Sequence, residues 1–134
     1  MAYTPQKPFD FELFYRGLFF ALEAKHQKSH LSFNRIKTHQ LESMKLVEDN
    51  GGYSFFLIRI EDLKKTQDKF RAFIISRKRI VSLMKESNKS SCNASELKRW
   101  AEFEAARIRL SSEKYTYTWN FPVFFEEFVQ KGGI

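Results

Sequence analysis

Residues 9–25 read FDFELFYRGLFFALEAK, and this stretch decides the fold. Two segments rich in aromatic and aliphatic residues, Phe9–Tyr15 and Leu18–Lys25, have the composition of β-strands. Only Arg16 and Gly17 separate them. A two-residue connection that ends in glycine is typical of a tight hairpin, because glycine adopts a positive φ without steric cost. The stretch therefore predicts two antiparallel strands joined by a turn.

The register of this hairpin brings three charged residues together. If Tyr15 pairs with Leu18, Asp10 lies opposite Glu23, with the two Cβ atoms roughly 5 Å apart. Lys25 is two residues beyond Glu23 and points to the same face. Like charges in opposed positions destabilise a sheet, and a bound cation would offset their repulsion. The layout indicates a metal-dependent nuclease. The alternative is a solvated hairpin face on which two acids meet incidentally.

These residue types suit the hydrolysis of a phosphodiester bond. Carboxylate oxygens fit the hard cation Mg²⁺, which keeps several of its waters, and we expect Mn²⁺ to substitute for it. The candidate metal ligands are Asp10, Glu23 and the backbone carbonyl of Ala24. The metal would lower the pKa of a bound water. Lys25 would orient that water or neutralise the developing charge.

Helical and strand patterns alternate beyond the hairpin. We predict helices over Phe33–Asn50, Arg77–Ser87, Ser95–Leu110 and Pro122–Val129, and strands over Tyr53–Ile60, Phe70–Ser76 and Tyr115–Phe121. Ser32 would cap the first helix and Gly51-Gly52 would end it, and His26–Leu31 would be a loop. The pattern predicts one domain over residues 1–134. Its class is α/β, with a mixed β-sheet flanked by helices; an α+β arrangement is the alternative.

Gln40 is unusual because it falls on the apolar stripe of its predicted helix, between Ile36 and Met44. A buried glutamine needs hydrogen-bond partners. Either it points at the metal-bound water or the scissile phosphate and serves catalysis, or it is a satisfied amide of the core or of its rim. Two further acids, Glu12 and Glu104, are expected at solvated or rim positions rather than in the site.

The charge of the chain favours a polyanionic partner. Its 134 residues carry a formal net charge of +7, and the sequence pI is about 9.6, a balance that points to nucleic acid or to an anionic membrane. Zinc at His26 and His30 is disfavoured, since it prefers thiolates or a helical histidine pair, and a phosphate contact beside Lys28 suits them better. The candidate DNA-binding residues are Lys28, Arg35, Lys37, His39, Arg77, Lys78 and Arg79.

Two further features indicate a cytoplasmic protein. Cys92 is the only cysteine, so no internal disulfide can form and a reducing compartment is expected. No apolar run approaches the roughly 20 residues that a membrane span requires, and residues 1–10 have no apolar core of a signal peptide. We expect a protein of the cytoplasm that does not enter a membrane.

In their order and spacing, these motifs resemble those of the RecU-type Holliday junction resolvases within the PD-(D/E)xK nuclease superfamily. The resemblance covers about residues 8–60. It rests on Asp10–Tyr15, Arg16-Gly17, Phe20–Lys25, Ser32-Phe33, His39-Gln40, and Gly51-Gly52 followed by an apolar strand.

The resemblance implies a restriction-endonuclease-like fold. It also implies a homodimeric, Mg²⁺-dependent endonuclease that nicks four-way DNA junctions symmetrically during recombination and repair. Asp10 and Glu23 would bind the metal, Lys25 would be the catalytic lysine, and Gln40 would assist in the active site.

The chain departs from this family at its beginning. Family members carry a longer N-terminal portion, with a helix that bears an acidic residue and with a protruding stalk, whereas nine residues precede Asp10 here. Two alternatives therefore stay open. One is a nuclease of the same superfamily that acts on another substrate, such as linear or flapped DNA. The other is a non-catalytic nucleic-acid-binding protein on the same scaffold.

Overall fold

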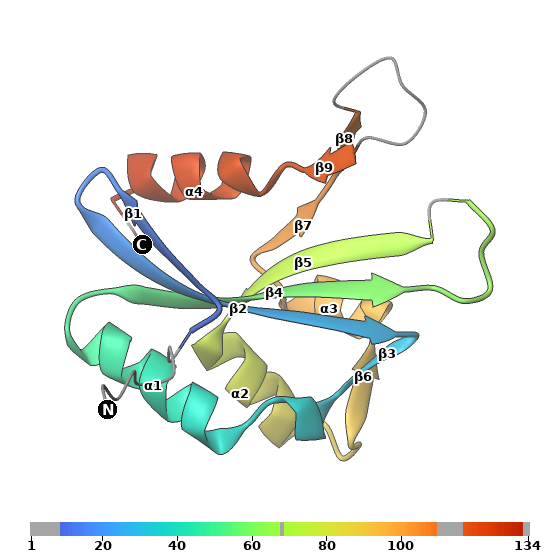
Figure 1. The fold of residues 1–134 in the computed structure, drawn as a ribbon. Helices are drawn as coiled ribbons and strands as arrows, with labels where there is room; N and C mark the ends of the chain where they lie inside the picture. The colour runs from blue at the N-terminus through green and yellow to red at the C-terminus, as the bar shows by residue number, and fades with distance from the viewer. Residues whose placement is uncertain (1–8, 68, 110–116, 133–134) are drawn as a thin grey trace, which may run out of the picture.

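A five-stranded mixed sheet forms the centre of the molecule (Figure 1). The computed structural model describes residues 9–67, 69–109 and 117–132. The strand order is β1-β2-β4-β5-β7, with β2 and β4 parallel and the other neighbours antiparallel. This sheet and its flanking helices confirm the predicted α/β class. The five strands are β1 (Phe11–Tyr15), β2 (Leu18–Lys28), β4 (Tyr53–Glu61), β5 (Phe70–Ser76) and β7 (Phe103–Ala105).

The β1–β2 hairpin has the predicted register, with Tyr15 opposite Leu18. Both residues of the turn have positive φ, 49° at Arg16 and 83° at Gly17, which is the type I′ turn that matches the twist of the flanking strands. β1 begins at Phe11, two residues later than predicted. β2 runs on to Lys28 because its pairing with β4 continues that far.

The predicted loop over His26–Leu31 is therefore wrong. Its first residues belong to β2, and a further strand, β3 (His30–Ser32), follows. β3 pairs antiparallel with β6 (Ser91–Asn93), a polar segment for which no strand was predicted. The pairing joins two polar segments far apart in the chain, and neither has a strand pattern of its own.

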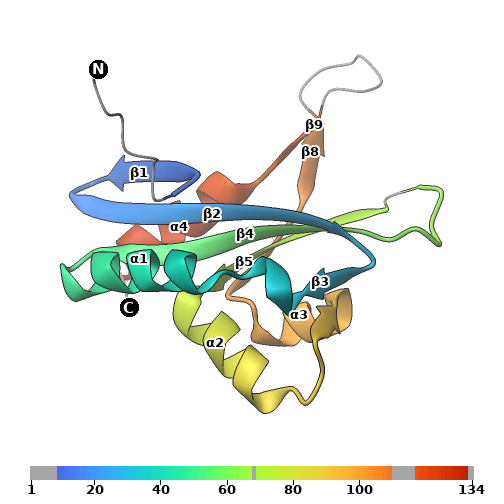
Figure 2. The same cartoon turned by 60° about the horizontal axis from the view of Figure 1, so that its bottom comes forward.

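Helices cover the two faces of the sheet unequally (Figures 1 and 2). α1 (Thr38–Asp49), α2 (Arg77–Glu86) and α3 (Ala94–Trp100) lie on one face, and α4 (Phe121–Gln130) lies on the other. The main apolar cluster packs between the first three helices and the sheet. A second cluster, rich in phenylalanine, packs under α4. None of the helices in the described ranges is long and apolar enough to span a membrane.

The first helix begins later than its sequence predicts. Residues Phe33–Arg35 form a separate 3-10 turn, and the chain is extended at Ile36 and Lys37 before α1 starts. Ser32 precedes the 3-10 turn, and its side chain caps nothing. Phe33 and Ile36 are both buried in the main cluster, so core packing, rather than a continuous helical stripe, sets the path of the chain here.

The predicted helix over Ser95–Leu110 is also wrong. α3 ends at Trp100, and the chain then forms β7 and β8 (Arg107–Arg109), which pairs with β9 (Tyr117–Trp119). Long-range contacts explain the change: Glu104 binds Arg71 of β5 through two hydrogen bonds of 2.8 and 2.9 Å. Residue 110 of that helix, and residues 115 and 116 of the last predicted strand, lie outside the described residues.

Candidate active site

Asp10 and Glu23 lie together next to the first residue of β1. Glu23 is on β2 and is only 3% exposed, whereas Asp10 directly precedes β1 and is exposed. The Asp10 backbone N–H donates to Glu23 Oε1 at 3.2 Å, and the Ala24 N–H donates to Asp10 Oδ2 at 2.9 Å. The two carboxylates are thus held side by side, although Asp10 lies just beyond the strand ladder.

The edge of β2 is open next to these carboxylates. β1 pairs with β2 only as far as Leu22, and no other described strand follows β1 along that edge. The N–H and C=O of one strand residue point to the same side. Because the Ala24 N–H points to Asp10, the Ala24 carbonyl faces the same open edge. Two carboxylates and one carbonyl therefore meet where a substrate can approach.

Gln40 connects the acidic pair to Lys25. Its amide Nε2 donates to Glu23 Oε2 at 3.2 Å, and its Oε1 accepts a hydrogen bond of 3.0 Å from Lys25 Nζ. Gln40 is in the first turn of α1, and the same Oε1 also accepts from the Lys37 backbone N–H at 3.3 Å. The helix start thus holds the amide over the strand. Gln40 is half-buried, a position at the rim of the core beside Glu23 and Lys25.

Burial and charge act together on Glu23. Removal from water raises the pKa of this carboxyl to about 7, and the neighbouring Asp10 carboxylate contributes in the same direction. The positive charge of Lys25 opposes the shift without cancelling it. A cation beside Glu23 would favour its ionised form, so the position suits an acid that binds a metal.

A basic pocket begins at the end of β2 and encloses about 670 Å³. Lys28 and Arg35, two of the residues predicted to bind DNA, line it. Lys37 and His39 are exposed at the start of α1, near Gln40 in the chain. Ser90 and Ser91 also line the pocket. No local pattern indicated them, because only the β3–β6 pairing brings them here. The remaining lining residues are His26, Gln27, His30 and Ser32.

A family model for recombination protein U, RecU, matches residues 2–115. The chain belongs to the RecU family. Proteins of this family are Holliday junction resolvases, endonucleases that hydrolyse DNA phosphodiester bonds with the help of a divalent metal and bind branched DNA.

Other comparisons add less to this assignment. No match was found among curated proteins. A similar solved structure is that of Hjc, a Holliday junction resolvase from the archaeal hyperthermophile Archaeoglobus fulgidus. It shares 15% sequence identity, its match covers 74% of this chain and 75% of that chain, and the TM-score is 0.39. The family assignment rests on the RecU model.

The oxygen atoms at the β2 edge fit the divalent metal on which RecU-family enzymes depend. No group of three or more His, Cys, Asp or Glu side chains in the described part of the chain is placed to hold a metal. A hard cation that retains its waters needs only one or two carboxylates. Asp10, Glu23 and the Ala24 carbonyl supply such a set.

The basic run Arg77–Arg79, which was predicted to bind DNA, does not line the basic pocket at the end of β2. Arg77 is 12% exposed, and it donates to Glu48 Oε2 at 2.6 Å and to Glu48 Oε1 at 3.0 Å. Arg79 lies 3.5 Å from Glu102. The prediction that Arg77 contacts DNA is therefore wrong. Its side chain joins α2 to α1 through a largely buried ion pair with Glu48.

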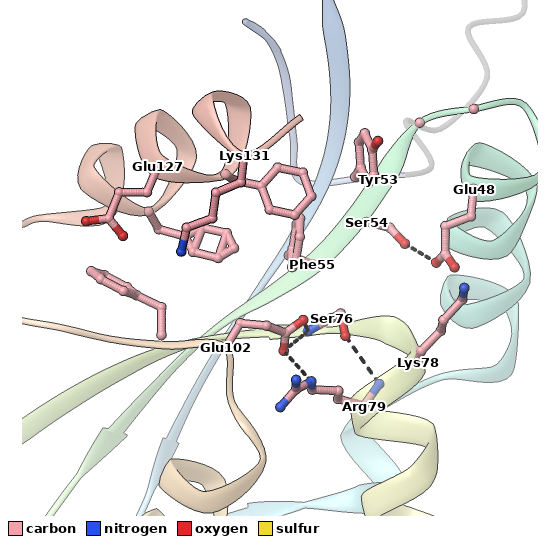
Figure 3. A pocket seen from close by; sticks show the side chains of 15 residues that line it. Glu48, Tyr53, Ser54, Phe55, Ser76, Lys78, Arg79, Glu102, Glu127 and Lys131 are labelled. Carbon is pink, nitrogen blue, oxygen red and sulfur yellow. Dashed lines mark hydrogen bonds and ion pairs between the residues drawn. The ribbon is translucent and has the colours of Figure 1, made fainter. Parts of the chain in front are cut away.

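Lys78 and Arg79 line a second pocket of about 600 Å³, between α4, β4 and the start of α2 (Figure 3). Aromatic side chains, among them Phe55, form part of its wall, and acids such as Glu48 and Glu127 lie on its rim. None of Asp10, Glu23, Lys25 and Gln40 lines this pocket. The structure therefore separates Lys78 and Arg79 from the basic pocket at the end of β2.

Proposed function

We propose that the protein is a Mg²⁺-dependent endonuclease that nicks four-way DNA junctions at the open edge of β2. The observation that carries this proposal is the connected set of Asp10, Glu23, Gln40 and Lys25. Two acids, an amide and an ammonium group are linked by hydrogen bonds of 2.9 to 3.2 Å on one strand edge. Membership of the RecU family supplies the reaction class.

The proposed metal ligands are Asp10, Glu23 and the Ala24 carbonyl. A bound divalent cation would supply Lewis-acid chemistry by lowering the pKa of a water and by neutralising phosphate charge. We take Mg²⁺ as the native metal, with Mn²⁺ as a substitute, because both accept oxygen ligands. Glu23 has to lose its proton before it can bind a metal, and its raised pKa places that step near neutral pH.

Lys25 and Gln40 act on the attacking water and the phosphate. The ammonium group of Lys25 has three donors, and one of them is directed to Gln40 Oε1. The other two are available to hold the water or a phosphate oxygen in place. Gln40 keeps Lys25 and Glu23 at fixed positions relative to each other, so that charge developing on the phosphate meets a preorganised donor.

The DNA backbone would lie in the basic pocket at the end of β2. Lys28 and Arg35 line that pocket, and Lys37 and His39 extend the surface toward Gln40. Cationic side chains of this kind bind phosphates irrespective of sequence, which suits an enzyme that selects DNA by its shape. We propose a homodimer in the cytoplasm, since two symmetric nicks in one junction need two active sites.

A cleavage assay on a synthetic four-way junction tests this function. Wild type should nick the junction with Mg²⁺ or Mn²⁺ and not in EDTA. Asp10→Asn and Lys25→Ala should each lower the rate by about 100-fold or more, the range that such groups contribute, while junction binding in EDTA persists. Lys98→Ala is the matched control, because Glu96-Leu97-Lys98 is a second Glu-x-Lys sequence and lies on α3.

Equal trace cleavage by wild type, Asp10→Asn and Lys25→Ala would reject the proposed enzyme. A panel of linear, flapped and four-way substrates in the same assay measures the junction preference. If linear DNA is cut as fast as the junction, the protein is a metal-dependent nuclease, but its proposed preference for four-way junctions is wrong.

One observation favours a second, non-catalytic function. Each acid already accepts a backbone N–H at the end of the hairpin, so Asp10 and Glu23 also serve to close an open sheet edge. A protein that uses them only in this way would bind DNA without cutting it. Calorimetric titration with Mg²⁺ and Mn²⁺ distinguishes the two functions, because stoichiometric metal binding that Glu23→Gln abolishes requires a metal site.

A further inference from the structure

The face of the sheet under α4 is covered at only one end. Phe20 and Leu22 of β2 and Phe55 of β4 are buried there against α4. Farther along the same face, the alternation of side chains places His26 of β2 beside Arg59 of β4. Both of these residues are exposed. Figure 1 shows that α4 does not extend over this part of the sheet.

The uncovered end carries a cluster of cationic and aromatic side chains. The guanidinium carbon of Arg59 lies 4.9 Å from the ring centroid of Phe70, and Lys69 Nζ lies 5.4 Å from it. Arg59 Nη2 is 3.1 Å from His26 Nδ1, and the rings of His26 and Phe70 are 6.2 Å apart. Glu61 is one of the acids near this cluster in the described part of the chain, and its Oε1 lies 3.2 Å from Lys69 Nζ.

This cluster lies on the reverse side of the proposed catalytic edge. His26 directly follows Lys25 on β2 and therefore points to the opposite face. In the described part of the chain no strand pairs with this edge of β2 after Leu22, so a DNA strand held at Lys25 can pass over the edge. His26 also lines the basic pocket with Lys28, so this residue belongs both to the pocket and to the cluster.

Branched DNA offers a ligand that duplex DNA lacks. At a branch point the last base pair of an arm can lose its stacking neighbour, and bases with an unstacked face bind to aromatic rings and to the planes of arginine side chains. We propose that His26, Arg59 and Phe70 hold an unstacked base of branched DNA beside the phosphate that is cut. The cluster would thereby favour branched DNA over duplex. This inference rests on the proposed function, which places the phosphate at Lys25.

Two substitutions separate stacking from charge and from packing. Arg59→Lys keeps the charge and removes the planar guanidinium, and Phe70→Leu keeps an apolar side chain and removes the ring. Arg99→Lys is the matched control, because Arg99 is an exposed arginine on α3. Circular dichroism and thermal melting first establish that each variant is folded.

Binding is then measured in EDTA, without cleavage, on a four-way junction and on a linear duplex of the same arm sequence. A 2-aminopurine placed at the branch point reports stacking through its fluorescence. We expect Arg59→Lys and Phe70→Leu each to weaken junction binding by about 10-fold and duplex binding by less than about twofold. The 2-aminopurine quenching that wild type produces should be lost in Phe70→Leu, and Arg99→Lys should behave as wild type.

Equal losses on junction and duplex, unchanged quenching in Phe70→Leu, or a wild type that does not prefer the junction would each overturn the inference. A different result would reject the proposed nuclease and leave this inference intact. If wild type quenches the probe and prefers the junction but does not cut it with Mg²⁺ or Mn²⁺, the base-binding surface stands and the nuclease does not.

Discussion

At the scale of the residue, Glu23 is only 3% exposed, yet its carboxylate lies beside that of Asp10. Its pKa in the folded protein is about 7, above the ordinary value of 4.5. For an acid with a raised pKa, the unfolded chain loses its proton more readily than the folded one. The folded state is therefore disfavoured above about pH 7, and this cost is relieved as the pH falls from 7 towards 4.5.

The first prediction is that Glu23→Gln removes this pH dependence from the metal-free protein. The free energy of unfolding of the variant, minus that of wild type, should rise by about 2 kcal/mol from pH 5 to pH 8. This is less than the full pKa shift corresponds to, because part of the shift acts below pH 5. Urea unfolding in EDTA at the two pH values measures the change. Glu12→Gln removes an exposed acid from the same hairpin and is the control. An identical stability difference at pH 5 and pH 8 would contradict the prediction.

At the scale of the element, the β1–β2 turn fixes which residues face each other across the hairpin. The second prediction is that Gly17→Ala destabilises the protein by about 1–2 kcal/mol, the cost of a left-handed conformation for a residue with a Cβ. Apart from the glycine and its two chain neighbours, no heavy atom lies within 4 Å of the position of that Cβ, and φ is +83°, so the loss comes from the backbone conformation. Gly17→Asn should cost less, because asparagine tolerates positive φ. Chemical unfolding compares the three proteins, and equal losses in the two variants would show that crowding, not φ, is responsible.

The same hairpin shows what could be predicted from the sequence. Its turn and its alternation are local, so the positions of Asp10 and Glu23 followed from residues 9–25 alone. The helix predicted over Ser95–Leu110 failed because Glu104 binds Arg71, more than thirty residues away in the chain. No local pattern encodes that contact, and tertiary pairing overrides helical propensity. The approach of Gln40 to Lys25 likewise needed the helix to pack on the sheet.

The third prediction concerns the ion pair that joins α1 and α2. Burial raises the pKa of the Glu48 carboxyl, but hydrogen bonds from Arg77 and Ser54 outweigh it and hold this pKa below its usual value. Arg77→Ala leaves the carboxylate without its main partner, so we expect a loss of about 2–4 kcal/mol. Because the pKa is depressed, the stabilisation is present at neutral pH and disappears as the medium becomes acidic enough to protonate Glu48.

The control for this ion pair is Arg79→Ala. Arg79 is 52% exposed and lies 3.5 Å from Glu102, so solvent screens the interaction and we expect a loss of at most about 1 kcal/mol. Thermal and urea unfolding at pH 7 compare the two variants. If Arg79→Ala is as damaging as Arg77→Ala, burial does not explain the strength of the Glu48 pair.

At the scale of the whole molecule, the net charge of +7 does not say which surface meets DNA. Two pockets contain cationic side chains, and they lie on different parts of the fold. Lys28 and Arg35 line the pocket that continues from the proposed catalytic edge. Lys131 lines the pocket between α4 and α2 instead (Figure 3). Composition predicted a polyanionic partner, but only the three-dimensional fold separates these two surfaces.

The salt dependence of junction binding distinguishes the two surfaces, and this is the fourth prediction. Each phosphate that a cationic side chain neutralises adds about −0.9 to the slope of log K against log salt concentration. Lys28→Gln and Arg35→Gln should therefore each flatten the slope by about 0.9, while Lys131→Gln should leave it unchanged. The slopes come from anisotropy titrations of a labelled junction in EDTA at several salt concentrations. A flattening in Lys131→Gln alone would place the DNA on the pocket beside α4, which neither Asp10 nor Glu23 lines.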